Sequence, residues 1–580
     1  METLLLMVVS GAGFLVAYHT YGRFLARKIF KLNPDATVPS KELHDGVDYV
    51  ASPKEIIFGH HFTSIAGTGP IVGPAIGIIW GWLPAMLWIV FGSIFMGAVH
   101  DFGTLVVSLR NQGKSISEIA ARYINGRVRF IFFIVVFLVL LIVIAIFGMV
   151  IAIVFDKFPS SVIPVWFQIP IAIGLGHAVY KRNRRVVPST VIAVALMYGA
   201  ITLGAVIEAR SPGALTITSI GPVPATGVWT IILLAYAWIA STLPVTTLLQ
   251  PRDYINAWQL FVMMGLLCIG VAASSLTGEL HMAAPMVNPS GPGTGIPSWW
   301  PLMFVTIACG AISGFHALVA SGTSPKQIGN EQHATFIGYG SMLVEGFLAV
   351  LVIICVGAGI GMAYRVQATG EILTGHAAWS QHYASWQSAD GLAAQLSAVV
   401  TGAANMMRTL GLAEVVGVTL MGVFIASFAG TTLDTAVRIQ RYVVGELAGD
   451  LKMPLLSNRW TATTFAVLTA AALAFASGAD GKGALRLWPM FGAANQLLAA
   501  LALLVVTMYL RRRGGWACIV AAVPCLLMLV ITGWAMTLKE IEFYQAQNWL
   551  LVAIGAIIIA LAAWMTVETA ILFVTPRHTE

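Results

Sequence analysis

The sequence has 580 residues, of which 58% are hydrophobic and only 10% are charged. A soluble globular protein carries about 25% charged residues and lacks a series of long apolar runs, so the composition excludes that class and indicates an integral membrane protein. The net charge of +7 does not indicate a nucleic-acid partner, because the Lys and Arg residues stand in short clusters between apolar runs, as the positive-inside rule expects.

The apolar runs predict an all-α polytopic membrane protein with about fifteen transmembrane helices. The first run has no basic residue before it and no small-residue cleavage site, so we interpret it as a retained anchor helix and not as a signal peptide. In chain order the predicted spans are 2–20, 60–79, 82–108, 129–153, 161–180, 186–207, 229–249, 254–276, 301–323, 336–363, 414–436, 460–477, 484–510, 516–537 and 548–573.

Five basic clusters fall on one side of this topology, and the loops on the other side are poor in Lys and Arg. The positive-inside rule makes the basic side cytoplasmic, which places the N-terminus outside and the C-terminus inside. The outer loop 364–413 is long enough to hold outer or re-entrant helices. The basic clusters lie at 23–31, 110–129, 181–185, 438–459 and 511–513.

The topology divides the chain into two halves with opposite orientation, because seven spans follow the first one before residue 301 and seven come after it. A repeat with an odd number of spans necessarily inverts. The predicted parts are an N-terminal anchor helix at 1–30, a cytoplasmic loop at 31–58, a first transmembrane repeat at 59–276, an outer loop at 277–300, a second, inverted repeat at 301–573 and a cytoplasmic tail at 574–580.

Two Gly/Pro-broken stretches carry the same pattern, G-x-H-x5-G-T-x-P, at 59–70 and 314–325. Gly favours non-helical backbone and Pro deletes an N–H donor, so we expect both helices to open there. Paired broken helices indicate the substrate site of a transporter built from inverted repeats, although small residues are also ordinary at contacts between membrane helices. The predicted substrate-binding residues are Gly67, Thr68, Gly69, Pro70, Gly322, Thr323, Ser324 and Lys326.

The free N–H groups of the first opening would hold a substrate carboxylate at the positive end of a half-helix. Lys326 follows the second opening within one helical turn, where its ammonium group could hold that carboxylate in an inward-facing state. The alternative is that Lys326 is a positive-inside residue at the cytoplasmic surface.

Ionisable groups inside spans cost about 2.5–3.5 kcal/mol at mid-helix, so each is a functional candidate. Burial of Glu345 would disfavour its charged form and suit proton exchange, and Asp434 among hydroxyl groups would suit either a proton or sodium. The alternatives are that the histidines are packing residues with satisfied hydrogen bonds, and that the groups near the span ends extend their charged atoms to the membrane interface. The predicted ion-coupling residues are Glu345, Asp434, His61, His316 and Asp101.

Other chemistries find no support in the sequence. Gly481-Lys482-Gly483 lacks the spacing of a phosphate-binding loop. The five cysteines fall inside apolar runs without paired spacing, and the adjacent pairs His60-His61 and His100-Asp101 point to different faces of a helix, so no metal site is predicted. We therefore expect no enzyme activity, no cofactor, a small-molecule substrate, contact with membrane lipid and no nucleic-acid partner.

The residues Gly59 to Pro74, Trp80-Gly81-Trp82 and Gly97 to Phe102 closely resemble the carbon starvation protein (CstA) family. The resemblance continues past Gly310 to His316 and Pro489 to Gln496 and covers most of the chain. It implies a bacterial inner-membrane transporter of the amino acid-polyamine-organocation superfamily, with a leucine-transporter-like core of two inverted five-helix repeats plus extra helices.

The resemblance also implies uptake of peptides or small carboxylates such as pyruvate, driven by protons. We therefore predict a multi-pass symporter with alternating access, coupled to H+ rather than Na+. The alternatives are a sodium-coupled amino-acid or peptide carrier and, from other classes, a channel or a membrane enzyme.

Overall fold

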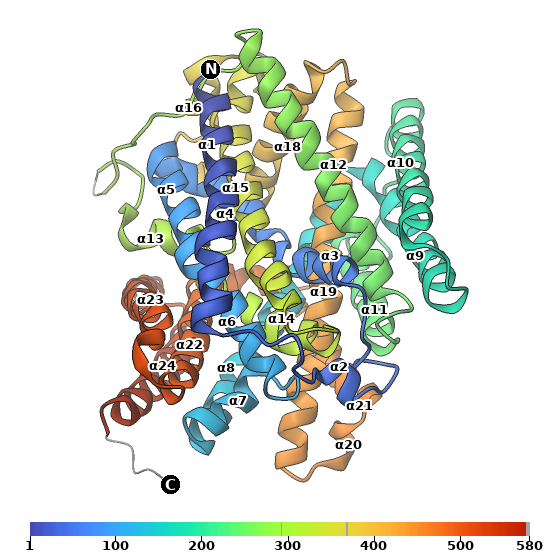
Figure 1. Ribbon diagram of the computed structural model, residues 1–580. Helices are drawn as coiled ribbons and strands as arrows, with labels where there is room; N and C mark the ends of the chain where they lie inside the picture. Colours follow the sequence, from blue (N-terminus) through green and yellow to red (C-terminus); the bar gives the residue numbers. More distant parts are fainter. Residues whose placement is uncertain (292, 367–368, 576–580) are drawn as a thin grey trace.

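The computed structural model describes residues 1–291, 293–366 and 369–575. In these residues the chain forms a bundle of helices, with the N-terminus at one end of the bundle and the C-terminal helix reaching the other end (Figure 1). The helices of the first half are α1 Glu2–Ala17, α2 Pro39–Glu42, α3 Lys54–Ala66, α4 Gly69–Gly77, α5 Trp82–Gly92, α6 Ala98–Leu109, α7 Ile116–Tyr123, α8 Gly126–Lys157, α9 Val162–Gly176, α10 Val186–Arg210, α11 Ala225–Thr242 and α12 Leu249–Leu276.

The second half is also helical, with one short hairpin. In the predicted outer loop 364–413, the strands β1 Tyr364–Arg365 and β2 Ile372–Leu373 pair in antiparallel fashion, and three helices follow them, so this loop does hold helices of its own. The helices of this half are α13 Trp299–Thr306, α14 Gly314–Gly322, α15 Ser341–Gly357, α16 Gly375–His382, α17 Trp386–Ala389, α18 Leu392–Arg408, α19 Glu414–Asp450, α20 Pro454–Ser457, α21 Arg459–Ala474, α22 Trp488–Arg512, α23 Ile519–Gln545 and α24 Trp549–Val574.

The structure confirms an all-α polytopic membrane protein. Within the described residues, twelve helices are long and apolar enough to cross a membrane, and counting the bent pair α3–α4 gives thirteen. The other two predicted spans are shorter: 460–477 corresponds to α21 with 16 residues, and 301–323 is divided into α13 and α14 with 8 and 9 residues. A straight membrane span needs about 20 residues, so none of these three helices is long enough to cross a membrane alone.

The longest helices form the centre of the bundle. α8 runs for 32 residues and packs along α19, which runs for 37. The Asn125 side chain caps the start of α8 by accepting a hydrogen bond from the Val128 backbone N–H at 2.9 Å. α9 and α10 stand at one edge of the bundle, and α23 and α24 stand at the other (Figure 1). The broken helices lie between these edges.

The first broken helix opens where the sequence predicts. α3 ends at Ala66, α4 begins at Gly69, and the two helices are bent by 41°. Gly67 has φ +26°, a conformation that side-chain-bearing residues rarely adopt, and Pro70 fits the first turn of α4 because its missing N–H has no helical partner there. The predicted opening at Gly67–Pro70 is confirmed.

The second broken helix opens earlier than predicted. The prediction placed the opening at Gly322–Pro325, where α14 does end but no second half-helix follows, and the chain also leaves the helical conformation between the end of α13 and Gly314. The intervening segment 307–313 forms hydrogen bonds with side chains from other helices. The pattern of Gly, His, Thr and Pro residues gives no information about these partners. Gly322 instead ends α14, and Ser324–Lys326 forms a single 3-10 turn.

Two predicted boundaries also change. The cytoplasmic loop predicted at 31–58 contains α2 and ends at α3, which begins at Lys54. The C-terminal helix α24 extends to Val574, and residues 576–580 of the predicted tail lie outside the described residues. The inverted relation of the two halves stays a prediction.

Candidate functional site

A cavity of about 440 Å3 lies against both helix openings. At its inner end it is lined by Gly69 of the first opening, Cys309 of the second and Asn495 of α22. At its outer end it is lined by Pro297, Trp386 and Lys539, which belong to the end of the bundle that is poor in basic residues. The cavity therefore connects the two openings with one end of the molecule.

The first opening lies against hydroxyl groups of α19. Thr432 Oγ1 donates to the Ser64 carbonyl oxygen at 3.3 Å, and the Ser64 and Thr435 hydroxyls are 3.1 Å apart. A Cβ atom at Gly67 would lie 2.7 Å from Thr432 Oγ1, so only glycine allows this approach. These contacts give the opened backbone polar partners inside the bundle, as membrane depth requires.

Side chains from two other helical spans, 82–109 and α22, hold the second opening. Trp88 Nε1 donates to the Ile307 carbonyl oxygen at 3.0 Å, and Ser93 Oγ donates to the Gly310 carbonyl oxygen at 2.9 Å. Asn495 Nδ2 donates to Ser313 Oγ at 2.9 Å, while Asn495 Oδ1 accepts from the Phe315 backbone N–H at the same distance. The amide of Asn495 thus fixes the point where α14 begins.

Four predicted or neighbouring ionisable residues form a buried chain beneath the cavity. Asp101 Oδ1 lies 2.7 Å from His100 Nδ1, and Asp101 Oδ2 lies 2.9 Å from His316 Nδ1. The other ring nitrogen of His316, Nε2, lies 3.4 Å from Glu345 Oε2. All four side chains are fully buried. We name Asp101, His316 and Glu345 the central acid–histidine chain.

A second buried network surrounds Arg252 and is separate from this chain. The Arg252 guanidinium group pairs with Asp253 Oδ1 at 2.6 Å and also with Asp434, to which Tyr236 donates at 3.2 Å. His60 Nδ1 lies 2.6 Å from Asp253 Oδ2. Asp434 is therefore already neutralised by a permanent cation, which its sequence surroundings did not reveal.

At the basic end of the bundle, residues 45–52 are bonded to α19 and to the turn that follows α14. Asp48 accepts from Arg438 at 2.5 Å and from Arg441 at 2.9 Å, and the backbone N–H of Val50 donates to the Lys326 carbonyl oxygen at 3.1 Å. Burial alone would raise the pKa of Asp48, but Arg438, Arg441 and Lys326 together hold it well below its usual range. We name residues 45–52 with these partners the basic-end closure.

Lys326 belongs to this closure and does not line the cavity. Its side chain is 5% exposed, and its ammonium nitrogen lies 3.5 Å from the centre of the Tyr442 ring. Burial lowers the pKa of Lys326 to about 8. Lys326 is therefore not exposed at the surface, and its proposed role in an inward-facing state stays a prediction.

The structure brings together only part of the predicted site. Of the predicted substrate residues, Gly69 lines the cavity, while Thr323 and Ser324 contact His60 and His61 below it at 3.2 and 2.7 Å. Asp101, His316 and Glu345 form the central acid–histidine chain, and Asp434 belongs to the network around Arg252. The ion-coupling and substrate-binding roles of these residues stay predictions.

Sequence reasoning missed several residues around the site. Arg252 and Asp253 stand just before the apolar run 254–276, in the predicted loop between two spans, yet they lie in the buried first turns of α12. Cys309 was treated as an ordinary buried thiol, and Asn495 was noticed only within a resembling stretch. A polar pair directly preceding an apolar run is the one signal that could have found Arg252 and Asp253.

Comparison with known proteins decides the family. The family model described as "Carbon starvation protein CstA" matches residues 2–535. The chain belongs to the CstA family. A CstA protein of Campylobacter jejuni, named as a peptide transporter, is 34% identical over 94% of this chain and 81% of its own length.

Two further similarities complete the comparison. A CstA-family protein of Escherichia coli, named the pyruvate/proton symporter BtsT, is 32% identical over 94% of this chain and 84% of its own length. A solved structure of the Eremococcus coleocola manganese transporter has a TM-score of 0.49 and 11% identity, and the match covers 91% of this chain and 99% of that one. CstA-family membership makes this chain a multi-pass membrane transporter and not an enzyme.

Proposed function

We propose that this chain is a secondary active transporter of the bacterial inner membrane that imports peptides or small carboxylates such as pyruvate together with protons. The observation that carries the proposal is a cavity that reaches both helix openings from one end of the bundle, while the basic-end closure ties residues 45–52 to α19 at the other end. A binding site reached from one side at a time is what alternating access requires. The names of the relatives supply the substrate classes.

The start of α4 is the proposed place for a substrate carboxylate. Gly69 lines the cavity, and the N-terminal end of a helix carries a partial positive charge that favours anions. The amide of Asn495 lines the same cavity from α22. Peptides and pyruvate share a carboxylate, so this contact is common to both substrate classes.

Protons are the proposed coupling ion, and no cofactor takes part. Asp434 was the residue for which sodium was an equal alternative, and its pairing with Arg252 leaves little attraction for a second cation there. A relative named as a proton symporter supports the same choice.

The proposed orientation places the cavity outside and the basic-end closure in the cytoplasm. The basic clusters support this orientation, because Lys and Arg accumulate on the cytoplasmic side. The N-terminus then lies outside and the C-terminus inside.

Uptake into proteoliposomes under an imposed pH gradient tests the proposal. Labelled pyruvate and a labelled dipeptide are compared, each competing with the other, in sodium-containing and sodium-free buffer. We expect accumulation above the external concentration that a protonophore abolishes and that sodium removal leaves unchanged. Downhill flux alone would indicate a channel, chemical conversion without flux would indicate an enzyme, and loss of uptake without sodium would indicate a sodium-coupled carrier.

A further inference from the structure

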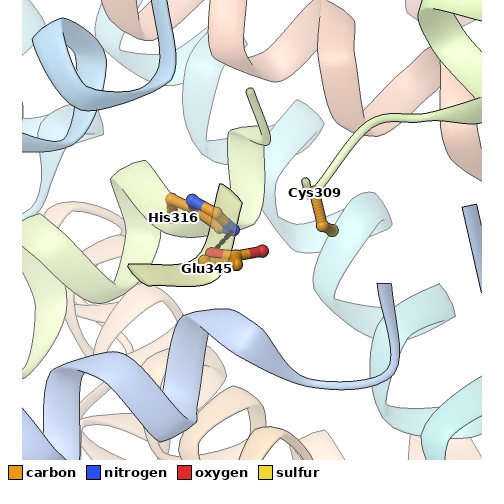
Figure 2. Close-up of side chains that lie close together, drawn as sticks. All are labelled: Cys309, His316 and Glu345. Carbon is orange, nitrogen blue, oxygen red and sulfur yellow. Dashed lines mark ion pairs between the residues drawn. The ribbon is translucent and has the colours of Figure 1, made fainter. Parts of the chain in front are cut away.

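Three side chains with different donor atoms lie close together at Cys309, which lines the cavity, and the two fully buried residues His316 and Glu345. Cys309 comes from the second opening, His316 from α14 and Glu345 from α15 (Figure 2). One ligand atom from each residue lies within 4.8 Å of the other two. Sulfur, nitrogen and oxygen donors from three segments thus surround one position. Cys309 also lines the cavity, which gives that position a route from outside the protein.

The imidazole of His316 is oriented by a carboxylate on its far side. Its Nδ1 lies 2.9 Å from Asp101 Oδ2, so a proton on Nδ1 is donated to Asp101, and Nε2 is the ring nitrogen that faces Glu345. Histidines that ligate metals almost always donate their other ring N–H to such a partner, which fixes the tautomer and the ring orientation. His316 has this arrangement within the protein itself.

The atoms that face this position lack hydrogen-bond partners. His316 Nε2 and both carboxylate oxygens of Glu345 have none, although both side chains are fully buried. Asp101 and Glu345 bring two carboxylates into the interior, and among the described residues neither pairs with Lys or Arg. Buried charge of this kind is costly unless it is paired or coordinates a metal. A divalent cation would satisfy the orphan atoms and offset the negative charge.

We infer that Cys309, His316 and Glu345 form a binding site for a zinc-class transition-metal ion. Thiolate, imidazole and carboxylate are the ligands of Zn2+, whereas Mg2+ and Ca2+ prefer sites made of oxygen. Three protein ligands leave the fourth tetrahedral position open, on the side of the cavity that Cys309 lines. Bonds of about 2.0–2.3 Å hold ligand atoms about 3.3–3.8 Å apart, so the side chains close by about 1 Å around the ion.

This site differs from the sequence expectation that no metal binds. That expectation considered neighbouring residues, whereas these ligands are separated by 7 and 29 positions along the chain and only the fold brings them together. The inference does not depend on which substrate is transported, because it concerns the binding of a metal ion to the protein in the absence of transport.

Direct metal binding to the purified full-length protein tests the inference. ZnCl2 binding is measured by equilibrium dialysis with elemental analysis, and CoCl2 is used to detect a thiolate-to-cobalt absorption band. We expect one ion per chain, a cobalt–thiolate band, and protection of Cys309 from maleimide alkylation by zinc. Cys309→Ser and His316→Gln should each weaken binding by about tenfold or more, and Asp101→Asn by about 10–100-fold as an orienting residue.

Cys518→Ser is the matched control, because Cys518 lies at the start of α23, away from the cavity lining, and should bind zinc like the unchanged protein. Thermal unfolding establishes that each variant is folded before its binding is compared. Absence of zinc binding in the folded parent protein, or equal affinity in folded Cys309→Ser and His316→Gln, would overturn the inference. Neither readout uses transport, so failure of the proposed function leaves this test intact.

Discussion

The close contact between the two helix openings makes Gly69 the most sensitive position of the proposed site. A Cβ atom at Gly69 would lie 2.2 Å from Cys309 Sγ and 2.5 Å from Cys309 Cβ. Ordinary contacts between such atoms are about 3.5–4.0 Å, so Gly69→Ala must push the openings apart by more than 1 Å. Overpacking of this kind costs about 1–3 kcal/mol. We expect a lower melting temperature. The same strain displaces the proposed carboxylate contact at the start of α4, so we also expect slower uptake, by about tenfold where 1.4 kcal/mol of the strain falls on the transport step.

A second substitution separates this contact from a general loss of stability. Cys309→Gly removes both clashing atoms, so the double variant should recover part of the melting temperature and of uptake relative to Gly69→Ala alone. The two residues touch, and residues in contact show coupling free energies of about 0.5–3 kcal/mol. Gly265→Ala on α12 is the control, because nothing lies within 4 Å of its new Cβ. Unchanged uptake in Gly69→Ala, or strictly additive effects in the double variant, would refute the reasoning.

Three further substitutions test the surroundings of the site by thermal unfolding. Asp48→Asn should lower the free energy of unfolding above about pH 4. The difference in free energy of unfolding between variant and parent should shrink as the pH falls lower, because Asp48, with its depressed pKa, contributes stability only while it is ionised. A difference that grows in acid would contradict this. Asp434→Asn should lower the free energy of unfolding by about 3–5 kcal/mol, because the buried Arg252 charge loses one of its two carboxylate partners. Adding Arg252→Gln should recover part of this loss. Equal stability of Asp434→Asn and the parent would show that the pair does not stabilise the protein. Asn495→Ala should lower the free energy of unfolding by about 1–3 kcal/mol, because it leaves the buried Phe315 N–H without its acceptor. An unchanged melting temperature would show that another group replaces the amide.

The first opening could be predicted from sequence because its cause is local. Gly67 supplies the backbone conformation, and Pro70 begins the next half-helix without needing a donor. The apolar runs and basic clusters likewise follow from the solubility of short segments in lipid and water. These properties belong to each segment alone, so no knowledge of distant partners was needed.

The second opening could not be predicted because its cause is tertiary. Segment 307–313 contains no proline, and carbonyl groups in it accept hydrogen bonds from Trp88, Ser93 and Gln496, which belong to two other helical spans. In the repeated pattern at 314–325, Gly322 ends α14 and Pro325 lies in a single 3-10 turn, so no second half-helix begins there. Proline and glycine therefore report where a chain can leave a helix, but partners elsewhere decide where it does.

The same division separates the predicted from the missed site residues. Glu345, His316 and Asp101 stood out singly, because an ionisable group in an apolar run is costly wherever it points. Their assembly into one chain depends on the packing of α6, α14 and α15, which brings together residues up to 244 positions apart. Arg252 shows the converse: it lies at the edge of an apolar run and would be unremarkable in a loop, yet its pairing with Asp434 buries both charges. The sequence of a membrane carrier thus identifies which groups need a partner, and the fold determines which partner each one receives.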